Sequence, residues 1–412
     1  MKYGCIGEHL KHSFSKEIHN ALADYEYEIC EIPRDELCAF MQKRDFSAIN
    51  VTIPYKEEVI PHLYYIDDVA KNIGAVNTIV NRDGKLYGYN TDFYGMTMLL
   101  RHAGVALAGK KVAILGTGGT SKTAAAVAAS EGAREVIKVS RSGKGDAITY
   151  EELYEKHRDT EAIINTTPSG MFPNIFDRAV DISKFPDLSG VIDAVYNPLR
   201  TPFISDAMER GIAAEGGLYM LVAQAVRASE IFIDKEYPGD ALEAVFNKIF
   251  SEKENAVLIG MPASGKSTVG KILAEALGRD FIDTDDMIVE KAGMPIKEIF
   301  EKFGEKYFRD LESECVKEAS ARSSVVIATG GGVPLRSENV KALRENGKIF
   351  FLDRPLENLI PTDSRPLASD REAIKKRYEE RYDIYCRSCD ERIDASSDAQ
   401  SVAEKILEFF RK

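Results

Sequence analysis

The sequence predicts an α/β protein whose sheets are largely parallel, and three observations support this fold class. Two segments, 109–142 and 255–273, each begin with a short apolar strand, continue through a glycine-rich turn and then become helical, as in βαβ units. Before residue 100, short apolar runs such as AINVTIP alternate with polar stretches of helical spacing. With 412 residues, the chain is long enough for two or three such domains.

The domain boundaries follow from the same pattern. We expect an N-terminal α/β lobe at 1–101, completed by helices at 217–250, and a dinucleotide-binding Rossmann domain at 102–216. The segment SEKEN, 251–255, is short, charged and free of apolar residues, so we expect a tight linker there. An α/β/α domain with a parallel sheet, which begins at the second glycine-rich turn, is expected at 256–412.

Composition and charge exclude several classes of protein. Apolar residues make up 44% of the chain, enough for packed interiors, and no apolar run reaches the ~18 residues of a membrane span. The formal net charge is −12 without any block of Lys and Arg, so neither a nucleic acid nor a membrane is expected as a partner. The start of the chain is too polar for a secretory signal.

The cysteines indicate the compartment. Six are scattered along the chain, and only Cys386 and Cys389 form a C-x-x-C, without a second pair or nearby histidines to complete a zinc site. We expect reduced thiols in a cytoplasmic protein. The sequence leaves the oligomeric state open.

The second glycine-rich turn, GMPASGKST, has the P-loop pattern G-x-x-x-x-G-K-[ST]. In such a loop, backbone N–H groups at a helix N-terminus cradle phosphate oxygens, the lysine neutralises the β- and γ-phosphates, and the hydroxyl after it holds Mg²⁺. A nucleoside triphosphate is therefore expected here. The residues expected to bind it are Gly260, Ser264, Gly265, Lys266, Ser267 and Thr268.

Charged residues and glycines after the P-loop predict a small anionic substrate. Asp283 and Asp285, in FIDTDDMI, are alternate residues at the end of an expected strand and would share one face. One carboxylate can then support Mg²⁺ while the other holds a substrate hydroxyl. The glycines 330–332, in IATGGGV, allow a small polar ligand to approach the backbone closely. Arginines, which suit a planar carboxylate, follow the P-loop at Arg309, Arg365 and Arg381.

Taken in order, GMPASGKST, DTD, GExxFRxxE, GGG, RPL and RxxxY resemble shikimate kinase over nearly all of 255–412. The resemblance implies ATP as the nucleotide, and Mg²⁺ at Ser267 and Asp283. It implies that shikimate is bound by Asp285, Arg309, Gly331, Gly332 and Arg381. It implies catalytic roles for Lys266, Asp285 and the lid arginine Arg365.

The stretch LENLIPTD before Arg365 departs from the family, since it is shorter, acidic and lacks a further arginine near the adenine. We expect a lid that closes less completely. A degenerate kinase half that only binds nucleotide, in a regulatory or scaffold protein, would also have such a lid. A gluconate- or nucleotide-type kinase would share the P-loop but would not explain this order of motifs.

The first glycine-rich turn, VAILGTGGTSKT, places Gly116, Gly118 and Gly119 between a strand and a helix, as in a dinucleotide site. The next strand, EVIKVS, ends about 20 residues further on, where an NAD site would carry Asp or Glu. The chain has Ser140 and Arg141 there. Because a cation accommodates a 2′-phosphate, we expect NADP(H) in preference to NAD.

The N-terminal lobe carries HSFSKEIHN, INVTIPYK, GAVNT and GYNTDFYG, in which Lys56 and Asp92 are the candidate catalytic pair. A lysine beside a carboxylate can pass a proton to a carbonyl oxygen as hydride reaches its carbon. Short polar side chains that could orient a polyhydroxylated ring are Ser13, Ser15, Thr52 and Asn77.

These motifs, followed by INTTPSGM, DAVYNPLRTP and GGLYMLVAQA, resemble shikimate dehydrogenase over most of 1–250. The resemblance implies that Lys56 and Asp92 are catalytic. It implies substrate contacts from Ser13, Ser15, Thr52, Asn77, Asp92, Tyr196 and Gln224. It implies cofactor contacts from Gly116, Gly118, Gly119, Ser140, Arg141, Thr166, Gly217 and Met220.

Together, the two resemblances imply a fusion of consecutive steps in aromatic amino acid (chorismate) biosynthesis. NADPH would reduce 3-dehydroshikimate to shikimate, and MgATP would phosphorylate shikimate to shikimate 3-phosphate. A quinate dehydrogenase that prefers NAD would share most of the motifs of the first half, although Arg141 favours NADP.

Overall fold

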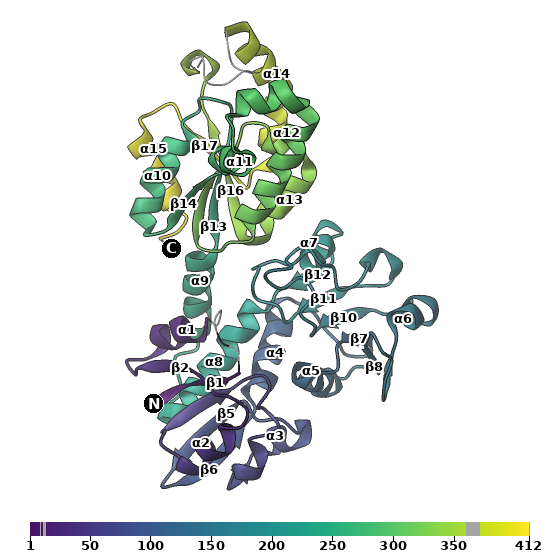
Figure 1. The fold of residues 1–412 in the computed structure, drawn as a ribbon. Coiled ribbons are helices and arrows are strands. Elements are labelled where there is room, and N and C mark those ends of the chain that lie inside the picture. The colour runs from purple at the N-terminus through teal and green to yellow at the C-terminus, as the bar shows by residue number, and fades with distance from the viewer. Residues whose placement is uncertain (9, 11–13, 360–370, 412) are drawn as a thin grey trace. The chain divides into compact units, whose positions relative to one another are not determined.

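The computed structural model describes residues 1–412 apart from 9, 11–13, 360–370 and 412 (Figure 1). The predicted site residues Ser13 and Arg365 lie outside the described residues. The chain divides into two compact units, Met1–Ile249 and Phe250–Lys412. The first unit holds two six-stranded sheets and the second a five-stranded sheet, so the predicted α/β fold class is confirmed.

The first sheet is mixed, with strand order β2-β1-β3-β5-β6-β4. Its strands are β1 (Tyr3–Gly7), β2 (Tyr27–Glu31), β3 (Ala48–Val51), β4 (Tyr65–Ile66), β5 (Thr78–Arg82) and β6 (Lys85–Tyr89). The accompanying helices are α1 (Ser15–Leu22), α2 (Leu37–Lys43), η1 (Ile60–His62) and α3 (Asp68–Ile73). Strands β5 and β6 form a hairpin because Asp83 and Gly84 both adopt positive φ, as a tight two-residue turn requires.

A helix from much later in the chain completes this lobe. In α8 (Leu218–Ile233), Ala228 and Phe232 pack with Cys5 and Tyr27 in one buried cluster. The same helix runs beside α4 (Thr91–His102), and the two backbones approach closely at Gly95, where an added Cβ would lie 2.7 Å from the carbonyl oxygen of Met220. The return of α8 therefore brings its polar residues to the start of α4.

His19, on the buried face of α1, is part of the packing of this lobe. Its ring stacks on Tyr27 with centroids 3.9 Å apart, and its Nδ1 lies 2.6 Å from the Tyr25 hydroxyl. The side chain is fully buried, and burial lowers the pKa of His19 to about 3. The imidazole is therefore neutral and structural at physiological pH.

This buried imidazole predicts instability in acid. The unfolded chain binds a proton at His19 near the ordinary pKa of 6.5, whereas the folded chain does so only near 3. Stability is therefore complete above the unfolded pKa and falls as the pH drops towards 3, by up to about 1.4 kcal/mol per pH unit from this group. We expect His19→Phe to flatten this dependence, measured by hydrogen exchange of residues 1–249 in urea. His62→Phe, at a half-buried histidine, is the control, and equal slopes for both variants would contradict the assignment.

The second sheet is wholly parallel, with strand order β12-β11-β10-β7-β8-β9. Its strands are β7 (Lys111–Leu115), β8 (Glu135–Val139), β9 (Ala147–Ile148), β10 (Ala162–Asn165), β11 (Gly190–Asp193) and β12 (Ala213–Glu215). Its helices are α5 (Gly119–Ser130), α6 (Tyr150–Lys156), η2 (Ile182–Lys184) and α7 (Pro202–Glu209). The strand order reverses beside β7, and ligands of open α/β sheets bind at such a reversal, outside the carboxyl ends of the strands. The Rossmann topology is the predicted one.

The second unit is a three-layered α/β/α domain with parallel strand order β14-β15-β13-β16-β17. Its strands are β13 (Asn255–Ile259), β14 (Asp280–Asp283), β15 (Val325–Ala328), β16 (Gly347–Asp353) and β17 (Glu391–Asp394). Its helices are α10 (Lys266–Leu277), α11 (Thr284–Ala292), α12 (Ile296–Ser320), η3 (Val333–Leu335), α13 (Ser337–Asn346), η4 (Leu356–Asn358), α14 (Arg371–Ser388) and α15 (Ala399–Leu407). Figure 1 shows α10 and α15 on one side of the sheet and α12 and α13 on the other.

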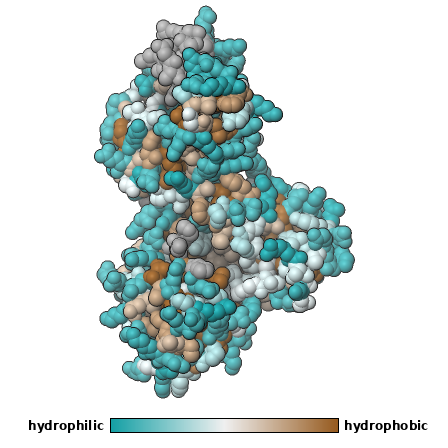
Figure 2. Space-filling view, viewed as in Figure 1, coloured by the Kyte–Doolittle hydropathy of each residue, from teal (hydrophilic) through white to brown (hydrophobic). Residues whose placement is uncertain are grey.

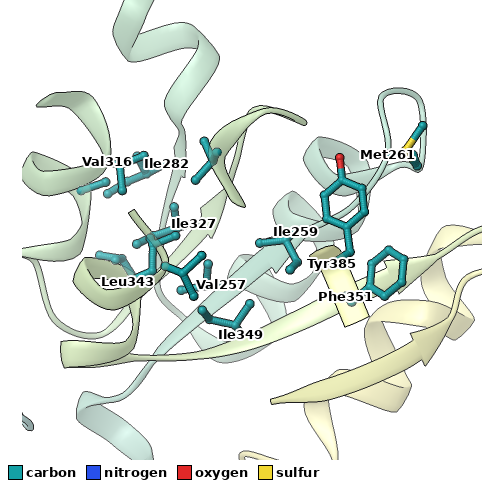
Figure 3. Packing of buried hydrophobic residues seen from close by; sticks show 14 of the residues in the cluster. Val257, Ile259, Met261, Ile282, Val316, Ile327, Leu343, Ile349, Phe351 and Tyr385 are labelled. Carbon is teal, nitrogen blue, oxygen red and sulfur yellow. The ribbon is translucent and has the colours of Figure 1, made fainter. Parts of the chain in front are cut away.

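Alternate residues of the central strands feed the two cores of this domain. Val257 and Ile259 of β13 pack with Ile349 and Phe351 of β16 and with Tyr385 of α14 (Figure 3). Residues between them in the strands face the other core, against α10 and α15. Because both faces are covered, β13 is buried along its whole length, as expected of a central parallel strand.

The segment 251–255, predicted as a tight linker, adjoins the boundary between the two units, but most of it is helical. Helix α9 (Ala241–Lys253) runs through most of it, and β13 begins at Asn255. Glu and Lys are good helix formers, and the Arg279 guanidinium binds the last carbonyls, with 2.7 Å to Glu254 O and 2.6 Å to Ser251 O. The boundary between the two units therefore falls within α9, between Ile249 and Phe250.

The surface in Figure 2 is mostly hydrophilic, with hydrophobic residues scattered among polar ones. Exposed apolar side chains include Ile53, Tyr64, Met208 and Phe303. Among the described residues, no helix is both long and apolar enough to cross a membrane.

Candidate active sites

The predicted pair Lys56 and Asp92 is in direct contact. Lys56 follows β3, Asp92 lies in the first turn of α4, and Lys56 Nζ donates to Asp92 Oδ2 over 2.6 Å. The two side chains are only 15% and 10% exposed, so the contact is shielded from bulk water. The backbone of Lys56 is held by Val76, whose N–H donates to the Lys56 carbonyl. The pair can therefore present a proton on Nζ from a fixed position.

Asn77 and Gln224 join the same site through Thr91. The Asn77 side-chain oxygen accepts from the Thr91 N–H at 2.7 Å, and its amide nitrogen donates to Thr91 Oγ1 at 3.1 Å. Thr91 Oγ1 in turn donates to Gln224 Oε1 over 3.3 Å. Two predicted substrate residues, Asn77 just before β5 and Gln224 in α8, thus contact Thr91, the neighbour of Asp92 at the N-terminus of α4.

Tyr196 brings the Rossmann domain to this lobe. Its ring packs edge-on against Phe14, with centroids 5.2 Å apart, next to the predicted Ser15 at the start of α1. Burial raises the pKa of Tyr196 to about 12, so its hydroxyl keeps its proton and can donate to an anion. Thr52 follows β3 and is half-buried.

Cys5 lies in the same region without the chemistry of a nucleophile. Burial raises the pKa of its thiol to about 12, although the Lys56 charge opposes this. The thiol therefore stays protonated at neutral pH and serves as a small apolar group in the core.

The glycine turn after β7 leaves room for a pyrophosphate. Gly116 adopts φ +107 and packs on Thr166, whose Oγ1 would lie 2.7 Å from an added Cβ. A Cβ at Gly118 would meet nothing within 4 Å, and one at Gly119 would meet only Lys56 Cδ, at 3.9 Å. The open N-terminus of α5 thus suits an anion and lies next to the Lys56 side chain. These residues fit a dinucleotide.

The other predicted cofactor residues lie at neighbouring strand ends. Ser140 follows β8, and its Oγ accepts from the Gly143 N–H at 3.1 Å. Arg141 is exposed and available to a phosphate. Gly217 caps α8, and a Cβ added there would lie 2.3 Å from the Ala194 carbonyl oxygen, so only glycine fits. Met220 lies in the first turn of α8 and is buried.

The P-loop of the second unit connects β13 to α10. Gly265 caps α10 with φ +92, a conformation that favours glycine. Lys266 is buried, and its Nζ donates to the carbonyls of Gly260 at 3.0 Å and Met261 at 2.9 Å, with Ser264 Oγ at 3.5 Å. Thr268 is exposed in the first turn of α10. The ammonium thus lies over the loop that would hold phosphate, and the loop fits a nucleoside triphosphate.

Ser267 and Asp283 place two oxygens together beside this loop, since Ser267 Oγ donates to Asp283 Oδ2 over 2.6 Å. Within the described parts of the chain, no three His, Cys, Asp or Glu side chains form a metal cluster. Mg²⁺ commonly takes one or two protein oxygens and completes its shell with phosphates and water. The pair fits such an ion.

Asp283 and Asp285 do not share one face of a strand, contrary to the prediction. Strand β14 ends at Asp283, which becomes the N-cap of α11, and its Oδ1 accepts from the Asp285 N–H at 3.0 Å. Asp285 lies in the first helical turn and points to the glycine turn after β15, where a Cβ at Gly330 would lie 2.6 Å from its Oδ1. An aspartate at the end of a strand is a strong helix cap, and this local preference ends the strand.

Arg309, Gly331, Gly332 and Arg381 surround the same turn. The Arg309 guanidinium lies so close to Gly332 that an added Cβ would be 1.8 Å from Nη1. Arg381 Nη1 donates to the Gly331 carbonyl over 3.1 Å, and Tyr385 Oη donates to the same oxygen over 2.5 Å. Asp285 and two arginines therefore lie around one glycine turn, a set of groups that suits a hydroxylated carboxylic acid.

Glu312 is a site residue that the sequence analysis did not single out. It is 1% exposed, and both its oxygens accept from Arg309 Nη1, at 3.0 and 2.8 Å. Burial raises the pKa of Glu312, and the Arg309 charge opposes this shift. The last position of GExxFRxxE carried the signal, because it lies one helical turn after the arginine.

The two sites define two classes of enzyme, a dinucleotide-dependent oxidoreductase and a P-loop kinase for a small anionic substrate. Family models match both units of the chain. The model "Shikimate dehydrogenase substrate binding domain" matches residues 5–79, and the model "Shikimate kinase" matches residues 262–411.

Known proteins agree with both matches. The shikimate dehydrogenase (NADP(+)) of Clostridium beijerinckii is 37% identical over 262 residues, which cover 60% of this chain and 96% of that protein. The shikimate kinase of Clostridium botulinum is 45% identical over 164 residues, 39% of this chain and 94% of that protein. The crystal structure of shikimate dehydrogenase 1 from Peptoclostridium difficile covers 60% of this chain and 98% of its own, with 34% identity and a TM-score of 0.56. The chain belongs to the shikimate dehydrogenase family in its N-terminal part and to the shikimate kinase family in its C-terminal part.

Proposed function

We propose that this chain reduces 3-dehydroshikimate to shikimate with NADPH and then phosphorylates shikimate with MgATP to shikimate 3-phosphate. The observation that carries the proposal is that one chain belongs to both families and has a Lys56–Asp92 pair beside a dinucleotide cradle in one unit. We assign 1–101 with 217–250 to substrate binding, 102–216 to NADP(H), and 256–412 to the kinase. The free cysteines of the chain suit a cytoplasmic enzyme, since thiols stay reduced in that compartment.

In the reduction, NADPH supplies the hydride. Lys56 Nζ donates a proton to the carbonyl oxygen of the substrate, which becomes the alcohol, and Asp92 holds the ammonium in position through their 2.6 Å contact. The proton on Nζ is then restored from solvent. Asn77 and Gln224 bind the ring hydroxyls, and the protonated Tyr196 hydroxyl donates to the substrate carboxylate. Arg141 binds the 2′-phosphate that distinguishes NADP from NAD.

In the kinase reaction, MgATP supplies the phosphoryl group. Asp285 accepts the proton of the shikimate 3-hydroxyl, and Arg309 and Arg381 bind its carboxylate. Ser267 and Asp283 would hold Mg²⁺, and Lys266, whose Nζ lies over the P-loop, would neutralise the transferring phosphate. Arg365, which lies outside the described residues, is the proposed lid arginine.

A test follows ADP formation by the full chain with shikimate and MgATP, beside Lys266→Met. We expect shikimate-dependent turnover in the wild type and a loss of at least about 10²-fold in the variant, because the phosphate loses its positive partner. Reduction of 3-dehydroshikimate by NADPH should be unchanged in the variant, since Lys266 lies in the other unit. Intact reduction without shikimate-dependent ADP in the wild type would instead indicate a kinase half that only binds nucleotide.

A further inference from the structure

Asp193, the last residue of β11, is a fully buried carboxylate that no step above uses. It accepts three hydrogen bonds: from Thr201 Oγ1 at 2.6 Å, from Asn165 Nδ2 at 2.9 Å and from the Val195 N–H at 3.0 Å. These donors come from the start of α7, the end of β10 and the loop after β11. Asp193 therefore joins three segments at the carboxyl edge of the Rossmann sheet, where cofactors bind.

The contact with Asn165 sets the shape of the next turn. Because Asn165 Nδ2 donates to Asp193, its Oδ1 faces the other way and accepts from the N–H of Thr167 at 3.0 Å and from its hydroxyl at 2.7 Å. Thr167 Oγ1 then accepts from the Ser169 N–H. The orientation of one amide thus fixes the turn at 166–169, which includes the predicted cofactor residue Thr166.

The contact with Val195 reaches the start of α8. Asp193 accepts from the Val195 N–H, and the carbonyl of Val195 accepts from the Gly217 N–H over 2.8 Å. A Cβ at Gly217 would lie 2.3 Å from the Ala194 carbonyl oxygen, so the start of α8 packs closely on this loop. The first turns of α8 carry Met220 and Gln224, and the same loop carries Tyr196.

A buried carboxyl is a costly way to stabilise a core. Burial raises the pKa of Asp193 to about 7, because its effect outweighs that of the three hydrogen bonds. An apolar side chain in this place would avoid the free-energy cost of removing a carboxyl group from water. Oxygen atoms that accept from three directions are needed, however, if three separate segments are to be held at fixed distances.

We propose that Asp193 is a positioning residue for the nicotinamide end of the cofactor site. It holds the 166–169 turn and the start of α8 at a fixed separation, so that the hydride-donating ring faces the substrate at Lys56 and Asp92. This inference rests on the proposed dehydrogenase function.

The test compares variants in NADPH-dependent reduction of 3-dehydroshikimate. Asp193→Ala should lower kcat/KM for NADPH on the order of 10²-fold, as for a misplaced reactant, and increase the isotope effect with 4-deuterated NADPH. Asp193→Asn keeps one oxygen that accepts from Val195 and Asn165, and its amide nitrogen can donate to Thr201 Oγ1, so we expect a loss below about fivefold. Adding Asn165→Ala to Asp193→Ala should lower kcat/KM little further, since both substitutions break the same hydrogen bond between the two residues.

Two threonine variants separate positioning from folding, and they remain informative if Asp193→Ala does not fold. Thr201→Val removes one donor to Asp193 at constant volume and should increase KM for NADPH. Thr160 lies just before the N-terminal end of β10, away from Asp193, and its buried hydroxyl donates to His157 O over 2.7 Å. Thr160→Val removes this hydroxyl and should change stability without changing KM for NADPH. Equal KM values and isotope effects for both variants, or only a smaller active fraction for Asp193→Ala, would overturn the proposal. If the wild type fails to reduce 3-dehydroshikimate, titration of NADPH fluorescence can still compare NADPH affinity in Thr201→Val and Thr160→Val. Failure of the proposed function is thereby distinguished from failure of the inference about Asp193.

Discussion

Replacing Lys56 with methionine should lower kcat for 3-dehydroshikimate reduction by about 10²- to 10⁴-fold, the range of a lost general acid. Methionine keeps most of the side-chain volume but cannot donate a proton to the carbonyl oxygen. It also leaves Asp92, which is only 10% exposed, without the ammonium 2.6 Å away. The decrease should appear in kcat more than in KM, because proton donation acts in the transition state. Steady-state oxidation of NADPH at saturating substrate measures it.

A lysine nearby provides the control. Lys122 in α5 pairs with Glu57, the neighbour of Lys56, over 2.6 Å, but 41% of its side chain is exposed. Lys122→Met should change kcat by less than about threefold, since an exposed ion pair contributes little. Shikimate-dependent ADP formation should be unchanged in both variants. Similar losses in the two variants would mean that general disturbance of this surface, and not proton donation, explains the effect at Lys56.

The contact between Lys56 and Asp92 could be predicted because each lies at the boundary of a regular element. The two residues are 36 positions apart, and their contact requires β3 to end and α4 to begin at the same place. The apolar run before Lys56 indicates the strand, and Asn90 is a recognisable helix cap that accepts from the Phe93 N–H. Local patterns therefore located the elements, and family motifs located the residues within them.

Other features depended on competition between local preferences. Asp285 was expected on a strand, but capping by Asp283 starts α11 one residue after it. The charged residues 251–253 were expected in a linker, but their helix propensity and the Arg279 contacts extend α9. In both places, polar residues that were expected outside a helix instead stabilise one: Asp283 caps the start of α11, and residues 251–253 continue α9.

Glu312 and Asp193 were missed for a different reason. An acidic residue on its own is usually a solvated surface group, and the apolar run GVIDAV around Asp193 indicates a strand but not the partners of its carboxyl. Its partners, Asn165 and Thr201, are 28 residues before and 8 residues after it, and they meet only when the parallel sheet forms. Convergence of this kind is tertiary information, which one sequence does not contain.

Replacing Arg309 with methionine should have the largest effect on the kinase half. The guanidinium is proposed to bind the substrate carboxylate, and it also neutralises Glu312, which is 1% exposed. We expect shikimate-dependent kcat/KM to fall by at least about 10²-fold and the second unit to lose about 3–5 kcal/mol, as when one partner of a buried pair is removed. Kinetics with shikimate and urea unfolding followed by hydrogen exchange of residues 250–411 measure the two effects. Arg322→Met, at an exposed arginine just after α12, should show neither.

The loss of stability should depend on pH in a direction set by Glu312. Its folded pKa is already raised by burial, and without the Arg309 charge it should rise further above its ordinary value of 4.5. The folded variant then binds a proton that the unfolded chain releases, so its stability is highest below about pH 4.5 and falls as the pH rises. Arg309→Met with Glu312→Gln removes the buried charge and should recover stability at neutral pH, while shikimate turnover stays low. If the double variant were no more stable than Arg309→Met, the buried carboxylate would not be the cause. If turnover returned with stability, Arg309 would support the fold and not bind the substrate.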